Sequence, residues 1–173
     1  INMLKGDGLV TSDHWKGSQV RVFSAKDISE IMEIRLVLET MCMERSVQKV
    51  TSQELEYLER RNQEYRQAFT PESTDRNLAI VINAEFHSFF IHKSENPWMQ
   101  GILEQLTNYL HLVRAPITQR TDGLKTIHEH EAILRAVSEG DYEQAVDCLR
   151  IHLLRVKTDL VSFRQNRSNT EPR

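Results

Sequence analysis

The sequence predicts an all-α fold, an antiparallel bundle of about six helices preceded by a short β-hairpin. From Asp27 onward, apolar residues recur with the spacing of a helix. The 173 residues include only six Gly and four Pro. A composition of 39% hydrophobic and 27% charged residues is typical of a helical globular protein and argues against a disordered chain or a β-sandwich. Short links between long helices favour antiparallel neighbours.

The N-terminal segment has a different pattern from the rest of the chain. Residues 8–11 and 17–23 read as two short strands around a turn. A lone hairpin is only marginally stable in water, so we expect it to belong to a domain whose body precedes Ile1, which is not an initiator methionine. The expected division is the end of one domain at 1–24, a helical domain at 25–165 and a polar, frayed tail at 166–173.

Helix ends can be placed from capping residues. We expect Asp27 to cap the first helix and Thr51 with Glu54 to form a capping box at the start of the second. The first helix should bury an apolar stripe. That stripe comprises Ile31, Ile34, Leu38 and Met41.

Proline and glycine delimit the remaining helices. A third helix is expected after Pro71, and a fourth should begin at Asn96-Pro97 and end before Pro116. Gly140 is expected to end the fifth helix, and Asp141 to cap a sixth that runs through Leu160.

Histidines occupy the inward faces of three predicted helices. His130 and His152 each fall on the apolar stripe of their helix, whereas His128 falls off it. Asn83 and His87 are one helical turn apart and project from one side of the third helix.

A single inward histidine is most often a core residue with a hydrogen-bond partner, but three of them favour a common metal site. Each buried polar ring left unsatisfied costs about 1 to 3 kcal/mol, and a divalent cation removes that cost by using the ring lone pairs. Imidazole suits Zn, Ni, Fe or Cu, and the amide oxygen of Asn83 could be a further ligand. Such a site would attract an anion such as a small carboxylate.

Charge, cysteine content and hydropathy bear on nucleic-acid binding, redox environment and membrane insertion. The net charge of -3 gives no global case for nucleic-acid binding. Cys42 and Cys148 have no metal-ligand spacing and indicate reduced residues of a cytoplasmic protein. No apolar run reaches the roughly 18 residues of a membrane span. His14, His92 and His111 are expected at the surface or in structural roles.

Several motifs resemble the FCD domain of GntR-type transcription regulators, in the FadR and VanR branch. They are NAEFHSFF at 83–90, EHEAILRAVSEGD at 129–141, LRIHL at 149–153 and the opening RLVLE at 35–39. Each motif is loose alone, but their order is specific, and the likeness covers about residues 27–160. The N-terminal hairpin also resembles the wing that ends the winged helix-turn-helix preceding this domain.

The resemblance implies a homodimeric, metabolite-responsive regulator that binds a small carboxylic acid over a divalent metal such as Zn or Ni. The metal ligands would then be Asn83, His87, His130 and His152, with Asn83 standing where the family usually has aspartate. Arg35 resembles a position that reaches the effector carboxylate in relatives, although an ion pair with Glu39 is an equal alternative. The second effector candidate is Arg114.

DNA contact would lie mostly upstream of Ile1. In the hairpin turn, Lys16 is the one candidate for a DNA-binding side chain, and any hairpin with a charged turn would look the same.

Two rival functions remain open from the sequence. A metal-dependent hydrolytic enzyme could use a three-histidine site, but it needs a general base nearby, and the neighbouring glutamates project in other directions. A purely structural helical module would keep the fold and leave the histidines in the core.

Overall fold

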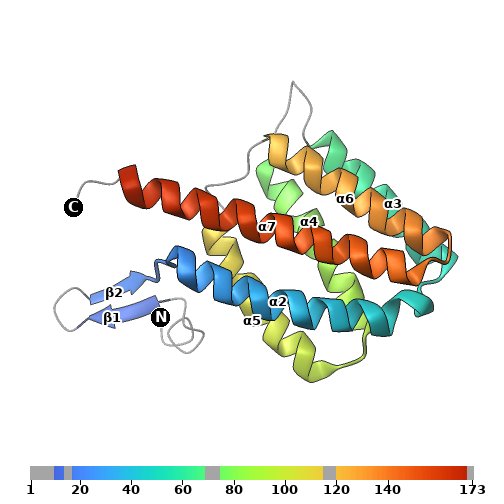
Figure 1. Cartoon of the computed structure of the whole chain (residues 1–173), viewed down its shortest axis with the longest axis horizontal. Coiled ribbons are helices and arrows are strands. Elements are labelled where there is room, and N and C mark those ends of the chain that lie inside the picture. Colours follow the sequence, from blue (N-terminus) through green and yellow to red (C-terminus); the bar gives the residue numbers. More distant parts are fainter. Residues whose placement is uncertain (1–9, 14–16, 69–74, 115–119, 171–173) are drawn as a thin grey trace.

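The computed structural model describes residues 10–13, 17–68, 75–114 and 120–170. In these parts of the chain, six α-helices follow a two-stranded antiparallel sheet (Figure 1), which confirms the predicted all-α class with its N-terminal hairpin. The elements are β1 (Val10–Asp13), β2 (Gly17–Val20), α2 (Ala25–Ser46), the 3-10 turn η1 (Val47–Lys49), α3 (Ser52–Gln67), α4 (Arg76–Lys93), α5 (Pro97–Arg114), α6 (Arg120–Ser138) and α7 (Tyr142–Thr170).

The hairpin pairs β1 with β2 in a register that sets Val10 opposite Val20 and Asp13 opposite Gly17. Its first strand includes Val10 and Thr11 of the predicted 8–11, and residues 8 and 9 lie outside the described residues. Gly17 has φ +73, a left-handed conformation that favours glycine at the end of a turn. Lys16, the predicted DNA contact, lies outside the described residues.

Helix α2 begins three residues earlier than predicted, because Ser24 and not Asp27 is its N-cap. The Ser24 hydroxyl accepts a hydrogen bond from the Asp27 amide (3.1 Å), and the Asp27 carboxylate accepts one from the Ser24 amide (2.8 Å). Asp27 is thus the third helical residue of a capping box, where a carboxylate also interacts favourably with the helix dipole.

The predicted apolar stripe of α2 is wrong for two of its four residues, since Ile31 and Leu38 do pack against the core, partly buried. Ile34 and Met41 are about half exposed, and the buried side includes Ile28, Arg35 and Glu39. The apolar period failed here because a charged pair, buried by mutual neutralisation, occupies the inward face of the helix.

The other predicted helix ends are confirmed where they are described. Thr51 and Glu54 form the second capping box, and Pro97 is the first residue of α5. Gly140, with φ +73, follows α6, and the Asp141 carboxylate accepts from the Gln144 amide at the start of α7 (3.0 Å). Helix α7 continues to Thr170, so most of the tail that we expected to be frayed is helical.

Helices α2 and α7 lie side by side and antiparallel along one face of the bundle (Figure 1), linked by the ion pairs Glu33–Lys157 and Glu44–Arg150. Helix α6 packs against α7, α3 against α6, and α4 against α2 and α3. The centre of the bundle is therefore lined by four helices, α2, α4, α6 and α7, and these four carry the site.

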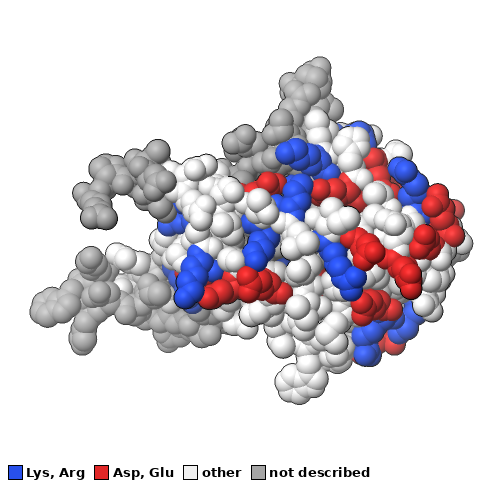
Figure 2. All heavy atoms as spheres, viewed as in Figure 1, with Lys and Arg blue, Asp and Glu red and all other residues white. Residues whose placement is uncertain are grey.

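One face of the bundle shows no dominant charge. On the face seen in Figure 2, basic and acidic side chains alternate over α2, α6 and α7, as expected for a chain with a net charge of -3. Among the described residues, no helix is both long enough and apolar enough to span a bilayer.

Candidate metal centre

Three helices bring their imidazoles together inside the bundle, as the helical spacing predicted. His87 comes from α4, His130 from α6 and His152 from α7, and all three are at most 4% exposed. One nitrogen from each ring can be chosen so that all lie within 4.8 Å of one another. Sites far apart in the sequence therefore form a single cluster of nitrogen ligands.

The spacing of two of these nitrogens matches a bound cation. Nε2 of His87 and Nε2 of His152 are 3.3 Å apart. Two nitrogens bound to tetrahedral zinc at about 2.0–2.1 Å lie about 3.3–3.4 Å from each other. The donor set therefore fits a divalent metal of the Zn or Ni type, which imidazole nitrogens bind well.

A buried carboxylate from α2 contacts the far side of the first ring. Nδ1 of His87 is 2.7 Å from the Glu39 carboxylate, and the other Glu39 oxygen accepts from Nε of Arg35. Glu39 and Arg35 are 3% and 2% exposed. The predicted Arg35–Glu39 ion pair is therefore present, and it continues to a histidine.

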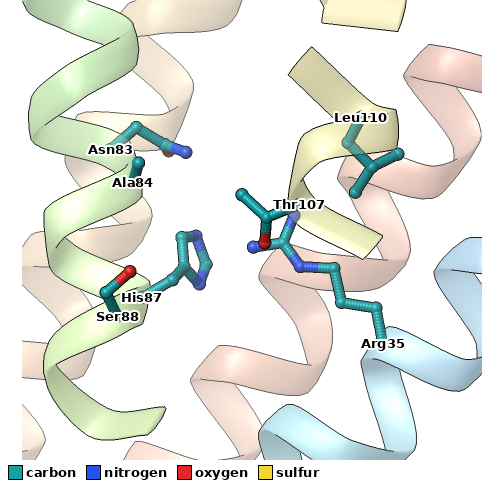
Figure 3. Close-up of a pocket in the computed structure, with 7 residues that line it drawn as sticks. All are labelled: Arg35, Asn83, Ala84, His87, Ser88, Thr107 and Leu110. Atoms are coloured by element: carbon teal, nitrogen blue, oxygen red, sulfur yellow. The ribbon is translucent and has the colours of Figure 1, made fainter. Parts of the chain in front are cut away.

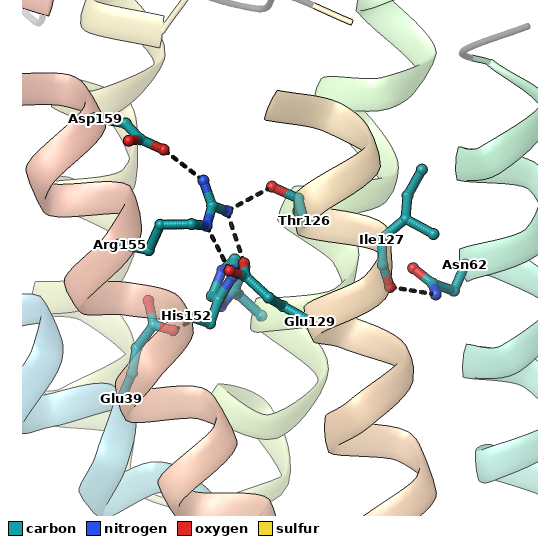
Figure 4. A network of polar contacts seen from close by, with 9 residues as sticks. Glu39, Asn62, Thr126, Ile127, Glu129, His152, Arg155 and Asp159 are labelled. Atoms are coloured by element: carbon teal, nitrogen blue, oxygen red, sulfur yellow. Dashed lines mark hydrogen bonds and ion pairs between the residues drawn. The ribbon is translucent and has the colours of Figure 1, made fainter. Parts of the chain in front are cut away.

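A second carboxylate occupies the equivalent place on the ring of His152 (Figure 4). Nδ1 of His152 is 2.7 Å from the Glu129 carboxylate, and Arg155 donates to the same carboxylate at 2.7 Å. Arg155 also donates to Asp159 (2.6 Å) and Thr126 (2.9 Å). This network joins α6 to α7 directly beside the histidines.

The third ring is held by packing. His130 stacks on Phe86 with ring centroids 3.7 Å apart and planes 5° apart, and the ring centroid of Tyr65 lies 6.1 Å from that of His130. Stacking of this kind fixes the plane of a ring. Phe86 precedes His87 on α4, so one helix contributes both a candidate ligand and the ring that positions another.

Burial and neighbouring charges shift the ionisation of these groups. Burial raises the pKa of Glu39, but Arg35 and His87 lower it more, so its carboxyl stays ionised. Burial also raises the pKa of Glu129, again outweighed by His152 and Arg155. Burial lowers the pKa of His152 from 6.5 to about 4, which keeps this ring neutral at pH 7. Neutral imidazoles are the form that binds metals.

A cavity opens on the α2, α4 and α5 side of the histidines (Figure 3). Its volume is about 10 Å³, room for about one water molecule, so a small metabolite would have to move its walls apart. The guanidinium group of Arg35 points into the cavity opposite Asn83 and His87. Ser88 and Thr107 add hydroxyl groups to its wall.

The predicted site residues therefore fall into three groups. The three histidines form one cluster, and His87 is its member that lines the cavity. Arg35 lines the same cavity, and so does Asn83, 6% exposed, one turn before His87. Arg114 ends α5, but its side chain lies outside the described residues. His92 and His128 are exposed at the surface, as expected.

Sequence reasoning missed the acidic and basic residues behind the rings. Glu129 was judged by its direction relative to His130, whereas it contacts His152 on the next helix. Of these residues, only Arg35 and Glu39 could be paired from the sequence, because they are one helical turn apart. Both carboxylates are engaged by a ring Nδ1 and an arginine, so neither is oriented as a general base for hydrolysis.

Comparisons with known proteins give one consistent picture. The model of the FCD domain matches residues 30–155. An uncharacterised HTH-type transcriptional regulator, YdhC of Bacillus subtilis (strain 168), is 28% identical over 153 residues, which are 88% of this chain and 68% of that relative.

Solved structures share the fold. McbR/YncC of E. coli superimposes with a TM-score of 0.83 at 21% identity, over 93% of this chain and 81% of that one. The Zn²⁺-bound FCD domain of TM0439, a putative transcriptional regulator, gives a TM-score of 0.67 at 23% identity, over 82% of this chain and 96% of that one.

Removal of a clustered histidine should abolish tight zinc binding. We expect wild-type protein, purified without a His tag, to retain about one zinc per chain, and His87→Ala and His152→Ala to lose it, because each removes one of three ligands. Elemental analysis after dialysis measures the content. His128→Ala, an exposed control on the same helix as His130, should keep its zinc; equal metal content in all four proteins would refute the site.

Metal-free protein should lose stability as the pH falls from 6.5 towards 4. In this window the unfolded chain takes up a proton on His152 while the folded chain does not, so the free energy of unfolding decreases. Urea titrations in EDTA measure this dependence. His152→Gln should flatten it and His128→Gln should not; an unchanged slope in His152→Gln would contradict the account.

Proposed function

This chain belongs to the FCD domain family of transcription regulators, and on that premise we propose that its helical domain binds a small carboxylate over a divalent metal and thereby modulates DNA binding. The chain is a regulator and not an enzyme. The observation that supports the effector proposal most strongly is the position of Arg35, whose guanidinium group faces the same cavity as His87. A cation and a guanidinium group on facing walls are suited to an anion between them.

The metal would be held by His87, His130 and His152, with Asn83 as a weaker oxygen ligand. When bound, it would supply a positive charge and an open coordination position for an oxygen of the effector. Since Asn83 is neutral, it cancels none of that charge, whereas the aspartate usual in the family would. An anionic effector is therefore attracted more strongly here.

Arg35 would bind the second oxygen of the carboxylate. Its Nε donates to Glu39, which fixes the plane of the guanidinium group. The terminal nitrogens point into the cavity (Figure 3), the geometry that suits a carboxylate. Ser88 and Thr107 can donate hydrogen bonds to further polar groups of the effector. Arg114 is a second, peripheral candidate.

The proposed output is a change in DNA affinity. A winged helix domain would contact the operator, with the β1–β2 hairpin as its wing and Lys16 near the phosphates. The regulator would act as a homodimer in the cytoplasm. Helix α2 starts five residues after β2 ends and carries Arg35, so it connects the hairpin directly to the cavity. Entry of an effector would move the cavity walls apart and thereby shift this helix.

Replacing the guanidinium group of Arg35 should weaken carboxylate binding while leaving metal binding in place. With zinc-loaded protein, we expect Arg35→Lys to reduce the affinity of the best ligand among acetate, malonate, succinate and citrate by about tenfold or more, because it removes the bidentate geometry. Isothermal titration measures this. Arg61→Lys, which affects a pair with Glu85 outside the cavity, is the control; equal loss in both variants would count against Arg35.

Effector and operator should be coupled in the protein that includes the winged helix domain. We expect the carboxylate selected above to change the affinity for operator DNA at least fivefold, the lower end of typical allosteric coupling. Fluorescence anisotropy at fixed salt gives the value. A ligand that fills the cavity yet leaves DNA affinity unchanged would reject the proposed output.

A further inference from the structure

We propose that Glu39 and Glu129 are the positioning residues of the metal centre, because each fixes the tautomer and direction of one histidine. This inference rests on the proposed metal site and goes beyond it, since neither glutamate is a candidate ligand. Both lie on the outer side of the rings, away from the nitrogens that converge.

Each glutamate is the middle of an Arg–Glu–His chain. Arg35, Glu39 and His87 form the first, between α2 and α4. The second consists of Arg155, Glu129 and His152, between α6 and α7 (Figure 4). The same three residue types thus occur in the same order on opposite sides of the cluster, although they come from different helices.

The arginines keep the carboxylates ionised, and ionised carboxylates can only accept hydrogen bonds. The 2.7 Å contacts therefore require a hydrogen on Nδ1 of each ring, and the neutral form of such a ring has no hydrogen on Nε2. The lone pair of each ring is then on Nε2. Two Nε2 atoms 3.3 Å apart, both with lone pairs and both facing inward, have the arrangement that a cation between them needs.

Without the carboxylates, each ring could exchange tautomers or rotate, and part of the population would present a hydrogen where the metal needs a lone pair. Carboxylates behind metal-bound histidines typically contribute 10- to 100-fold to metal affinity. His130 differs, since stacking on Phe86 fixes its plane. His87 and His152 have no such stack at 3.7 Å, so the two glutamates are what orients these rings.

The test uses Glu39→Gln, Glu129→Gln and a matched control, Glu85→Gln. Glu85 is a glutamate of α4 that pairs with Arg61 at 2.6 Å. Zinc affinity is measured by chelator competition, and ring tautomers by ¹⁵N NMR of the metal-free protein at pH 7.5. We expect each test variant to bind zinc about 10- to 100-fold more weakly, with His87 or His152 respectively no longer purely in the Nδ1–H form. The control should change affinity less than about twofold.

The outcomes separate the two proposals. Tight zinc binding by wild type that His87→Ala abolishes, together with near-normal affinity and unchanged tautomers in both test variants, would overturn the positioning role and leave the metal site standing. Absence of zinc binding by wild type would overturn both. Should Glu39→Gln fail to fold, Glu129→Gln decides alone, because Glu129 is only half-buried and its loss is better tolerated.

Discussion

The structure depends on how a helical bundle satisfies a group of buried polar side chains. Three imidazoles, two carboxylates and two guanidinium groups lie in or beside the centre, and each would carry a large desolvation cost alone. The two Arg–Glu–His chains remove that cost by pairing charge with charge and by turning the ring hydrogens outward. What remains at the centre is a set of nitrogen lone pairs, and a divalent cation is the partner that best suits them.

The fold supplies this arrangement through helices that enter the centre from different sides. The α6–α7 pair positions His130 and His152 and is joined by Arg155, while α4 supplies His87 together with Phe86. Helix α2 adds a second acidic and basic pair, Glu39 and Arg35, beside His87. Because α2 also follows the hairpin, the same element that completes the site would transmit its state to a DNA-binding domain under the proposed function.

The sequence predicted the helices and the inward histidines well, because period 3.6 and capping residues are local signals. It failed for α2, since the buried Arg35–Glu39 pair replaced apolar residues on the inward face and left Ile34 and Met41 outside. Glu129 and Arg155 could not be predicted as partners of His152. Their contacts depend on the register between α6 and α7, which no spacing within one helix reveals.

If imidazoles from three helices share one cation, X-ray absorption at the zinc edge of loaded, untagged protein should detect all of them. We expect a first shell of nitrogen and oxygen atoms at about 2.0–2.1 Å, with outer-shell scattering from three imidazole rings. A shell containing sulfur at about 2.3 Å, as Cys42 or Cys148 would give, or scattering from fewer than three rings, would contradict it.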